Sequence, residues 1–243
     1  MTNRLLQALN EIDRARIIPL LEHREFEVGQ VLVEQEKDLT VVAFPVTAQF
    51  THEFHGPGDV YVETGWVGCE GVTAPLPLLA EAPSPWRITT RLAGSAWCID
   101  AGRLRLIVKQ SVSLREGLAK LALYYNAQDS LSTACAAAHP VLSRVARWAL
   151  MASDHTGTTE IPVTQEEIAR LLSSQRTSVV EAFSKLRDIG ATKTMRGRVV
   201  IVDRTRLREA ACACCDELDR LAHMLDVPVG GLRRPDRALP WFG

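Results

Sequence analysis

The sequence contains no apolar run that approaches the roughly 20 residues needed to cross a bilayer. Its first residues lack the apolar block and small-residue cleavage site of a secretory signal peptide. It also has no phosphate-binding glycine loop, no HExxH pattern, no Ser/His/Asp order and no carboxylate pair in a plausible cleft. These absences predict a cytoplasmic protein that is not an enzyme and has no membrane partner.

The six cysteines include no CxxC pair. In a reducing compartment, scattered cysteines are by default free thiols. One cluster, Cys212-Ala213-Cys214-Cys215, has His223 nearby, but its spacing matches no zinc pattern. The sequence therefore predicts no metal site and no cofactor, and it assigns no role to Cys212, Cys214 or Cys215.

The net charge of −1 conceals a gradient along the chain. Residues 1–140 carry a net charge of −4 and residues 209–243 a net charge of −2, whereas residues 141–208 carry +5, from 12 Lys and Arg against seven Asp and Glu. Because salt screens charges over about 8 Å, the local charge decides whether phosphates are attracted. Residues 141–208 are therefore the candidate for contact with nucleic acid.

The first part of the chain, residues 1–101, shows the pattern of a small β-domain. Apolar residues recur at helical steps over residues 3–22, with an interruption near Pro19. Short β-branched runs then follow at residues 25–33, 40–44, 60–63, 86–92 and 96–99, separated by Gly, Pro and acidic residues. This spacing predicts an antiparallel, jelly-roll-like β-roll as the first domain of an α+β protein.

Residues 102–139 predict a long helix without proline, which ends at His139-Pro140 because proline disfavours helical backbone at the preceding residue. Such a helix either packs along the roll as an ordinary core helix or pairs with a second copy of itself. Near-heptad spacing favours pairing. The predicted homodimer interface consists of Leu114, Leu118, Leu121, Tyr125 and Gln128.

Residues 140–208 contain the signals of a winged helix-turn-helix. Thr164 and Glu167 form a capping-box pattern at the start of a helix, and Ser173-Ser174-Gln175 separates that helix from a second one over residues 176–187. Gly190 provides a helix stop, and residues 191–202 read as a β-hairpin with a basic tip. Two helices with a short joint, followed by a basic hairpin, are typical of DNA-binding domains.

The order of these parts resembles the Crp/Fnr family of bacterial regulators. The most specific match is VTQEEIARLL, SSQRTSVVEAFSKLRDIGAT and RGRVVIVD, over about residues 161–203, and FEVGQVL and VGCEGVTAPLPLL match the roll more weakly. The resemblance implies a cyclic-nucleotide-binding-type roll, a dimerisation helix and a winged helix that binds double-stranded DNA. It also implies a homodimer on palindromic promoter sites, in contact with RNA polymerase.

The resemblance places the base-reading residues on the second helix, with backbone contacts on both helices and the wing. Arg176 suits a guanine edge, and Glu181 either accepts from a cytosine amino group or pairs with Arg176 or Lys185. Ser173 replaces the usual turn glycine, which predicts a strained turn. The predicted base-reading residues are Arg176, Thr177, Val180 and Glu181. The predicted backbone contacts are Thr164, Gln165, Gln175, Ser178, Lys185, Lys193, Arg196 and Arg198.

The effector site departs from the family pattern. Gly68-Cys69-Glu70-Gly71 resembles the first half of the cyclic AMP site, but Pro83 stands where the phosphate-binding arginine belongs, so cyclic AMP is not expected. The candidate pocket residues are Glu70, Ser84 and Arg87, with Arg87 and Arg91 interpreted as surface arginines. The first cysteine is Cys69, which argues against an N-terminal iron–sulfur site. A haem ligand among the histidines stays open: His23, His52, His55, His139, His155 and His223.

Residues 209–243 form an extension beyond the winged helix. Leu218, Leu221, Ala222 and Leu225 predict a helix that packs on the wing or on a partner chain, and the sequence does not decide the structure beyond Pro228. A second interpretation of the whole chain is a winged-helix module that binds protein and not DNA. It predicts no salt-dependent binding to duplex DNA.

Overall fold

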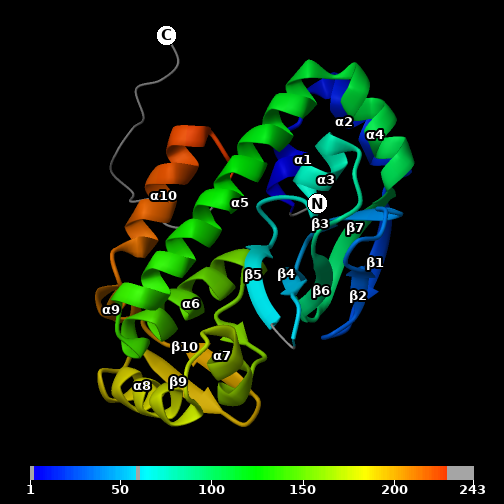
Figure 1. Cartoon of the computed structure of the whole chain (residues 1–243). Coiled ribbons are helices and arrows are strands. Elements are labelled where there is room, and N and C mark those ends of the chain that lie inside the picture. The colour runs from blue at the N-terminus through cyan, green and yellow to red at the C-terminus, as the bar shows by residue number, and fades with distance from the viewer. Residues whose placement is uncertain (1–2, 59–60, 229–243) are drawn as a thin grey trace.

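The computed structural model describes residues 3–58 and 61–228 (Figure 1). The chain begins with α1 (Arg4–Ala8), α2 (Glu11–Ile17) and the 3-10 helix η1 (Ile18–Leu20). Asn3 and Asn10 accept hydrogen bonds from the first turns of α1 and α2, so each asparagine begins a new helix. The predicted helical segment is therefore present, but it is broken at Asn10 as well as near Pro19.

Two antiparallel sheets form the β-roll. One has the strand order β1-β7-β3, and the other has the order β2-β6-β4-β5. The predicted α+β class with an antiparallel roll is confirmed. The strands are β1 (Glu22–Phe26), β2 (Val31–Val33), β3 (Val41–Pro45), β4 (Gln49–His55), β5 (Tyr61–Val67), β6 (Arg87–Leu92) and β7 (Gly94–Asp100).

The sequence pattern missed β4, although this strand lies inside its sheet between β6 and β5. Its residues Gln49, Thr51, His52 and Glu53 are polar yet buried. Several of these side chains have hydrogen-bond partners; for example, the Thr89 hydroxyl donates a hydrogen bond of 2.5 Å to the Glu53 carboxylate. A strand whose buried face is polar has no apolar alternation to reveal it.

The predicted helix over residues 102–139 is divided in two, α4 (Ala101–Gln110) and α5 (Val112–Ala138). Ser111 makes the break, because its hydroxyl accepts from the Leu114 amide at 3.0 Å and donates to Asp13 at 2.8 Å. A short helix absent from the prediction, α3 (Pro75–Ala80), packs against both α4 and α5. The Ser111 hydroxyl thus ties the start of α5 to the N-terminal helices.

The predicted dimer residues lie on the inner face of α5. Leu114, Leu118, Leu121, Tyr125 and Gln128 are all 4% exposed or less within the single chain. The α5 helix packs against β5, α3, α4 and the C-terminal helix α10 of the same chain. This part of the prediction needs correction, because the apolar periodicity marks the face that packs on the roll and not a free surface. An interface with a second copy must use the opposite face of α5.

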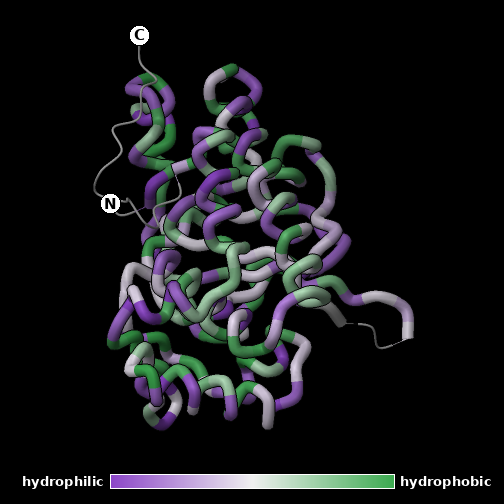
Figure 2. Tube along the Cα trace, turned by 90° about the vertical axis from the view of Figure 1, so that its left-hand side faces the viewer, coloured by the Kyte–Doolittle hydropathy of each residue, from purple (hydrophilic) through white to green (hydrophobic). Residues whose placement is uncertain are grey.

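The C-terminal domain has its own apolar core around Trp148 and Phe183. In the side view of Figure 2, green and purple alternate along its helices, as expected where one face of each helix is buried. Its elements are α6 (Val141–Thr156), β8 (Glu160–Ile161), α7 (Gln165–Leu171), α8 (Arg176–Asp188), β9 (Thr192–Met195), β10 (Arg198–Ile201) and α9 (Arg204–Ala210).

The last described helix is α10 (Cys214–Leu225), which lies beside α5 (Figure 1). Leu218 and Ala222 are buried in the same core as the β-roll. The extension therefore forms the predicted helix but packs on α5 of its own chain, in place of the wing or a partner. The predicted tail beyond Pro228 lies outside the described residues. Among the described helices, none combines the length and apolar character that crossing a membrane requires.

Candidate nucleic-acid interface

The first helix of the predicted pair, α7, begins at the capping box that the sequence indicates. The Thr164 hydroxyl accepts from the Glu167 amide at 3.2 Å, and the Glu167 carboxylate accepts from the Thr164 amide at 2.7 Å. This reciprocal arrangement satisfies two backbone donors that the helix leaves free. Thr164 is exposed and Gln165 is half-buried, which leaves both at the surface where a phosphate backbone would approach.

The turn between α7 and α8 is strained at Ser173, whose φ of 45° is in the left-handed region. A side chain in this conformation costs roughly 1–2 kcal/mol compared with glycine. The neighbouring Ser174 has no such strain, and its hydroxyl donates to the Leu172 carbonyl at 3.0 Å. Ser173, in place of the usual turn glycine, therefore strains the backbone of the turn, as the sequence predicts.

Ser173→Gly should raise the free energy of unfolding by about 0.5–1 kcal/mol. The substitution relieves the left-handed backbone strain, and the greater freedom of glycine in the unfolded chain offsets part of the gain. Urea denaturation at fixed protein concentration measures the change. Ser174→Gly is the matched control and should be destabilising, because it loses a hydrogen bond and gains only flexibility. Equal effects of both substitutions would contradict the strain at Ser173.

The second helix, α8, separates a buried face from an exposed face. Val179, Ala182, Phe183 and Leu186 are buried in the domain core. The predicted base-reading residues all lie on the exposed face: Arg176, Thr177, Val180 and Glu181. The N-terminal half of α8 thus presents one guanidinium, one hydroxyl, one aliphatic group and one carboxylate to solvent.

Ion pairs on this face show that the partner of Glu181 in the DNA-free protein is Lys185 and not Arg176. The Glu181 carboxylate lies 2.8 Å from the Lys185 ammonium, while Arg176 pairs with Glu166 of α7 at 3.4 Å. The hydrogen bond from Lys185 lowers the pKa of Glu181, so the carboxylate is charged at neutral pH. Exposed pairs of this kind contribute little to stability, because water and salt screen them. Phosphate or base contacts can therefore replace them at little cost.

The wing is the sheet β8-β10-β9, with Gly197 at φ 72° in the tight turn between β9 and β10. Gly190, at φ 72°, ends α8 where the sequence predicts a stop. Lys193, Arg196 and Arg198 are all exposed, and Arg198 pairs with Glu160 of β8. The remaining predicted backbone contacts, Gln175, Ser178 and Lys185, lie at the surface of α8 or at its N-cap. The basic hairpin is therefore present beside α8.

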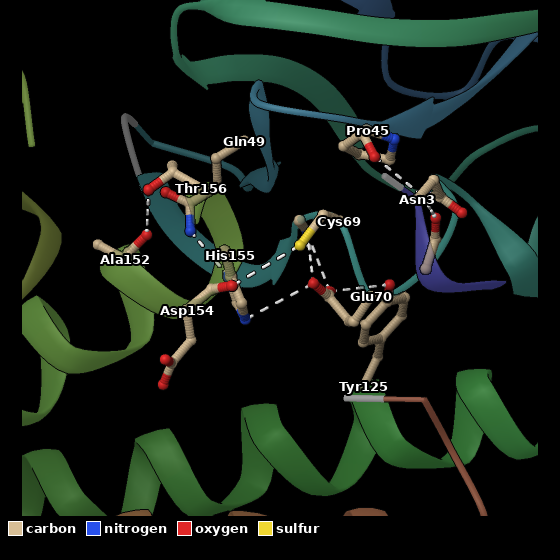
Figure 3. A network of polar contacts seen from close by, with 12 residues as sticks. Asn3, Pro45, Gln49, Cys69, Glu70, Tyr125, Ala152, Asp154, His155 and Thr156 are labelled. Carbon is tan, nitrogen blue, oxygen red and sulfur yellow. Dashed lines mark hydrogen bonds and ion pairs between the residues drawn. The ribbon is translucent and has the colours of Figure 1, made fainter. Parts of the chain in front are cut away.

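The Glu70 carboxylate lies within the protein and is already bonded (Figure 3). It accepts from the Gly68 amide at 2.9 Å and from the Tyr125 hydroxyl at 3.2 Å, and it lies 3.8 Å from His155 Nε2. His155 Nδ1 is 2.9 Å from the Gln49 amide nitrogen. This network joins the roll, α5 and α6 at one point. Sequence reasoning missed the role of His155, because α6 is far from Glu70 in the chain.

Two glycines allow this close approach. A Cβ atom at Gly68 would lie 2.4 Å from His155 Cβ, and one at Gly71 would lie 2.2 Å from the Tyr125 hydroxyl. Both contacts are shorter than packed atoms allow, so α5 and α6 reach the loop only because these positions have no side chain. The Glu70 carboxylate is therefore held by groups of the protein itself.

The structure does not bring the predicted effector residues together. The Ser84 hydroxyl donates to the Trp86 carbonyl at 2.7 Å, and Arg87 pairs with Glu34 and Glu53. None of these partners contacts Glu70 in the described residues. Arg91 differs from the prediction of a surface arginine, because its side chain is mostly buried and lies 3.6 Å from Glu63.

A cavity of about 250 Å³ lies where β5, α5, α6 and the end of α7 meet. Glu63, Gln128, Asp129 and Arg147 line it, and one side-chain atom each of Glu63, Gln128 and Arg147 lacks a hydrogen-bond partner. Burial raises the pKa of Asp129 to about 6, although the Gly65 amide opposes the shift. This cavity contains both apolar and polar side chains, and Glu70 does not line it.

Residues 143–210 match the family model of the Crp-like helix-turn-helix domain. A search against curated protein sequences gave no match. Solved structures with the same fold include a putative Crp/Fnr family transcriptional regulator from Eubacterium rectale, with 19% identity, a TM-score of 0.59, and coverage of 89% of this chain and 97% of that one.

Two further structures share the fold. FixK2 of Bradyrhizobium japonicum is 12% identical with a TM-score of 0.62, over 79% of this chain and 98% of that one. The c-di-GMP responsive global regulator CLP of Xanthomonas campestris is 15% identical with a TM-score of 0.57, over 80% of this chain and its full length. The similarity predicted from the sequence motifs is confirmed.

Proposed function

We propose that this chain, which has a Crp-like helix-turn-helix domain on the fold of Crp/Fnr family regulators, is a sequence-specific DNA-binding transcription regulator that acts as a homodimer. Its targets are palindromic promoter sites in the cytoplasm, where it contacts RNA polymerase. Its effector is a molecule other than cyclic AMP, or it has none. The proposed parts are a β-roll sensor domain over residues 1–101 and a dimerisation helix over residues 102–139. They are followed by a winged helix-turn-helix over residues 140–208 and an extension over residues 209–243.

The observation that carries the proposal is the exposed face of α8 beside the basic wing. Arg176, at the first position of α8, has 69% of its side chain exposed, which leaves the guanidinium free to exchange Glu166 for a guanine edge. Thr177, Val180 and Glu181 lie on the same exposed face, and Val180 suits a thymine methyl group. Lys193, Arg196 and Arg198 of the wing supply positive charge for the flanking phosphates.

The face of α5 that points away from the roll supports the homodimer. Its exposed residues follow alternating steps of four and three, which is the spacing of a two-stranded coiled coil. Leu123 is 56% exposed and Val112 is 60% exposed, so this face carries apolar side chains that a paired helix would bury. This exposed α5 seam comprises Val112, Glu116, Ala119, Leu123, Asn126, Ser130, Thr133 and Ala137.

Leu123→Glu should weaken the homodimer about tenfold or more, because two carboxylates would face each other across the two-fold axis. Sedimentation equilibrium over a range of protein concentrations measures the monomer–dimer constant. Met224→Glu, at a similarly exposed apolar residue of α10, is the matched control and should leave the constant unchanged. A dimer that tolerates Leu123→Glu would place the interface elsewhere.

The defining experiment is the selection of bound duplexes from a random DNA pool by the purified protein at two salt concentrations. The proposal expects a two-fold symmetric site with half-sites about 34–36 Å apart, and affinity that falls steeply with salt. The alternative of a winged-helix module that binds only protein expects no enriched sequence and no salt slope. The exposed guanidinium on α8 favours the DNA-binding function over this alternative.

A further inference from the structure

Four potential metal ligands from distant parts of the chain converge at the end of α5. Cys135, His139, Cys212 and Cys214 each offer one ligand atom, and these atoms all lie within 4.8 Å of one another. The Cys135 and Cys212 sulfurs are 3.5 Å apart, and the Cys214 sulfur is 3.5 Å from His139 Nδ1. We name these four residues the α5–α10 thiol cluster. Among the described residues, no other group of His, Cys, Asp and Glu meets this criterion.

The two shortest contacts, Cys135–Cys212 and Cys214–His139, are close in length to the edges of a tetrahedron around one metal ion. Zn–S bonds of about 2.3 Å and Zn–N bonds of about 2.0 Å put two sulfurs about 3.8 Å apart and a sulfur and a nitrogen about 3.5 Å apart. Three thiolates and one imidazole are also a ligand set that structural zinc sites use. The side chains therefore need only small shifts to bind an ion.

We propose that the α5–α10 thiol cluster is a closed, four-coordinate zinc site. Three sulfurs and one nitrogen complete the coordination of the ion, so no open position remains for a substrate. A disulfide between Cys135 and Cys212 needs a sulfur–sulfur distance of about 2.05 Å and gives no role to Cys214 or His139. An iron–sulfur cluster distributes its ligands over separate irons, whereas these four converge on one point.

The local structure holds the ligands in place. Cys135 and His139 are one helical turn apart at the end of α5, where His139 is the C-cap. Cys212 follows α9, and Cys214 is the first residue of α10. The three cysteines are 1%, 9% and 7% exposed and form a small buried cluster of their own. The short segment Cys212-Ala213-Cys214 therefore supplies two ligands, and Cys135 and His139, one helical turn apart on α5, supply the other two.

A buried positive charge beside the cluster supports an anionic site. Zinc with three thiolates carries a net charge of −1. Arg147 is 7% exposed, donates through one Nη atom to Ser132 at 2.9 Å, and has no hydrogen-bond partner at its other Nη atom. Arg147 and Cys135 line the same cavity. An unpaired buried guanidinium is costly, and a metal–thiolate complex supplies the counter-charge.

The position of the site gives it a mechanical role. His139 and Pro140 connect α5 to α6, and α6 is the first helix of the domain that contains the helix-turn-helix α7–α8. A bound ion would link this joint to the segment between α9 and α10. It would therefore fix both ends of the DNA-binding domain to α5, which restricts the orientation of α8 relative to the roll.

The test begins with the full-length protein, purified under reducing, oxygen-free conditions, and its metal content measured by elemental analysis. We expect one zinc per chain. After zinc removal, titration with Co²⁺ should give thiolate-to-cobalt charge-transfer absorption and the visible bands of tetrahedral cobalt, saturating at one equivalent. These signals report ligand type and geometry without any need for DNA.

Four variants then assign the ligands: Cys135→Ser, His139→Ala, Cys212→Ser and Cys214→Ser. Each should weaken zinc binding by more than about 100-fold, beyond the 10–100-fold effect typical of groups that only support a ligand. Cys215→Ser is the matched control, because its buried thiol adjoins Cys214 but lies outside the cluster, and it should retain the metal. Circular dichroism identifies any variant that fails to fold.

Reduced wild-type protein that binds neither zinc nor cobalt stoichiometrically would overturn the proposal, whatever the variants do. A Cys135–Cys212 disulfide as the resting state, or iron with labile sulfide, would also overturn it. Loss of metal from the Cys215→Ser control to the same degree would show that the ligands are assigned wrongly. Stoichiometric zinc in a protein that binds no DNA would uphold this site and contradict only the proposed function.

Discussion

Arg176→Ala should weaken binding to the selected DNA site by about 1–3 kcal/mol per half-site and relax the preference at one base pair in each half-site. The reason is that Arg176 stands at the start of α8 with its guanidinium exposed, and the surface ion pair with Glu166 does not hold it strongly. Fluorescence anisotropy with the selected duplex, and with duplexes changed at single positions, measures both effects.

Arg198→Ala is the informative comparison for Arg176. A wing arginine that contacts only phosphate should weaken binding to all sequences alike and lower the steepness of log affinity against log salt by about 0.9 for each protomer, or about 1.8 for the homodimer. Its selectivity should stay unchanged. If Arg176→Ala behaved like Arg198→Ala, with a changed salt slope and unchanged sequence preference, the assignment of α8 as the recognition helix would be wrong.

Glu63→Gln should remove a pH dependence of stability worth about 3 kcal/mol, since a pKa difference of one between the folded and unfolded states corresponds to about 1.4 kcal/mol. Burial raises the pKa of Glu63 from 4.5 to about 7, and the Arg91 guanidinium 3.6 Å away opposes this change without overcoming it. Because the pKa is raised in the folded state, the contribution is fully present below pH 4.5 and is lost as the pH rises through about 7.

The quantity to measure is the difference in free energy of unfolding between wild type and Glu63→Gln, by urea denaturation at several pH values and one protein concentration. Other titrating groups, such as the buried His52, cancel in this difference. The wild type should lose stability relative to the variant between about pH 4.5 and 7. Glu27→Gln, at an exposed carboxylate, should give a flat difference. A flat difference for Glu63→Gln would show that Glu63 ionises as easily in the folded protein as in the unfolded chain.

The winged helix-turn-helix was the most predictable part because local interactions define each of its boundaries. The capping box of Thr164 and Glu167, the joint at Ser173 and the stop at Gly190 all act within a few residues. The observed α8 differs from the prediction by one residue at its end. The base-reading roles of Arg176, Thr177, Val180 and Glu181 stay predictions, because exposure on α8 does not identify a base.

The surroundings of the predicted effector residues were less predictable, because their partners come from other elements. The motif around Glu70 suggests a ligand contact, but the Glu70 carboxylate accepts a hydrogen bond from Tyr125 and lies beside His155. The cavity between the domains also has no sequence signature, since its lining comes from β5, α5, α6 and the end of α7.

By itself, the sequence determined the α+β class and the helix-turn-helix, because periodicity, caps and turn residues act over short distances. It missed β4, α3 and the break between α4 and α5. The tertiary structure decided which element covers each apolar face. Periodicity identified the buried stripe of α5 correctly, yet only the fold showed that the roll and α10 cover it, and not a partner. The thiol cluster likewise needed the fold, because 77 residues separate Cys135 from Cys212 and no local spacing connects them.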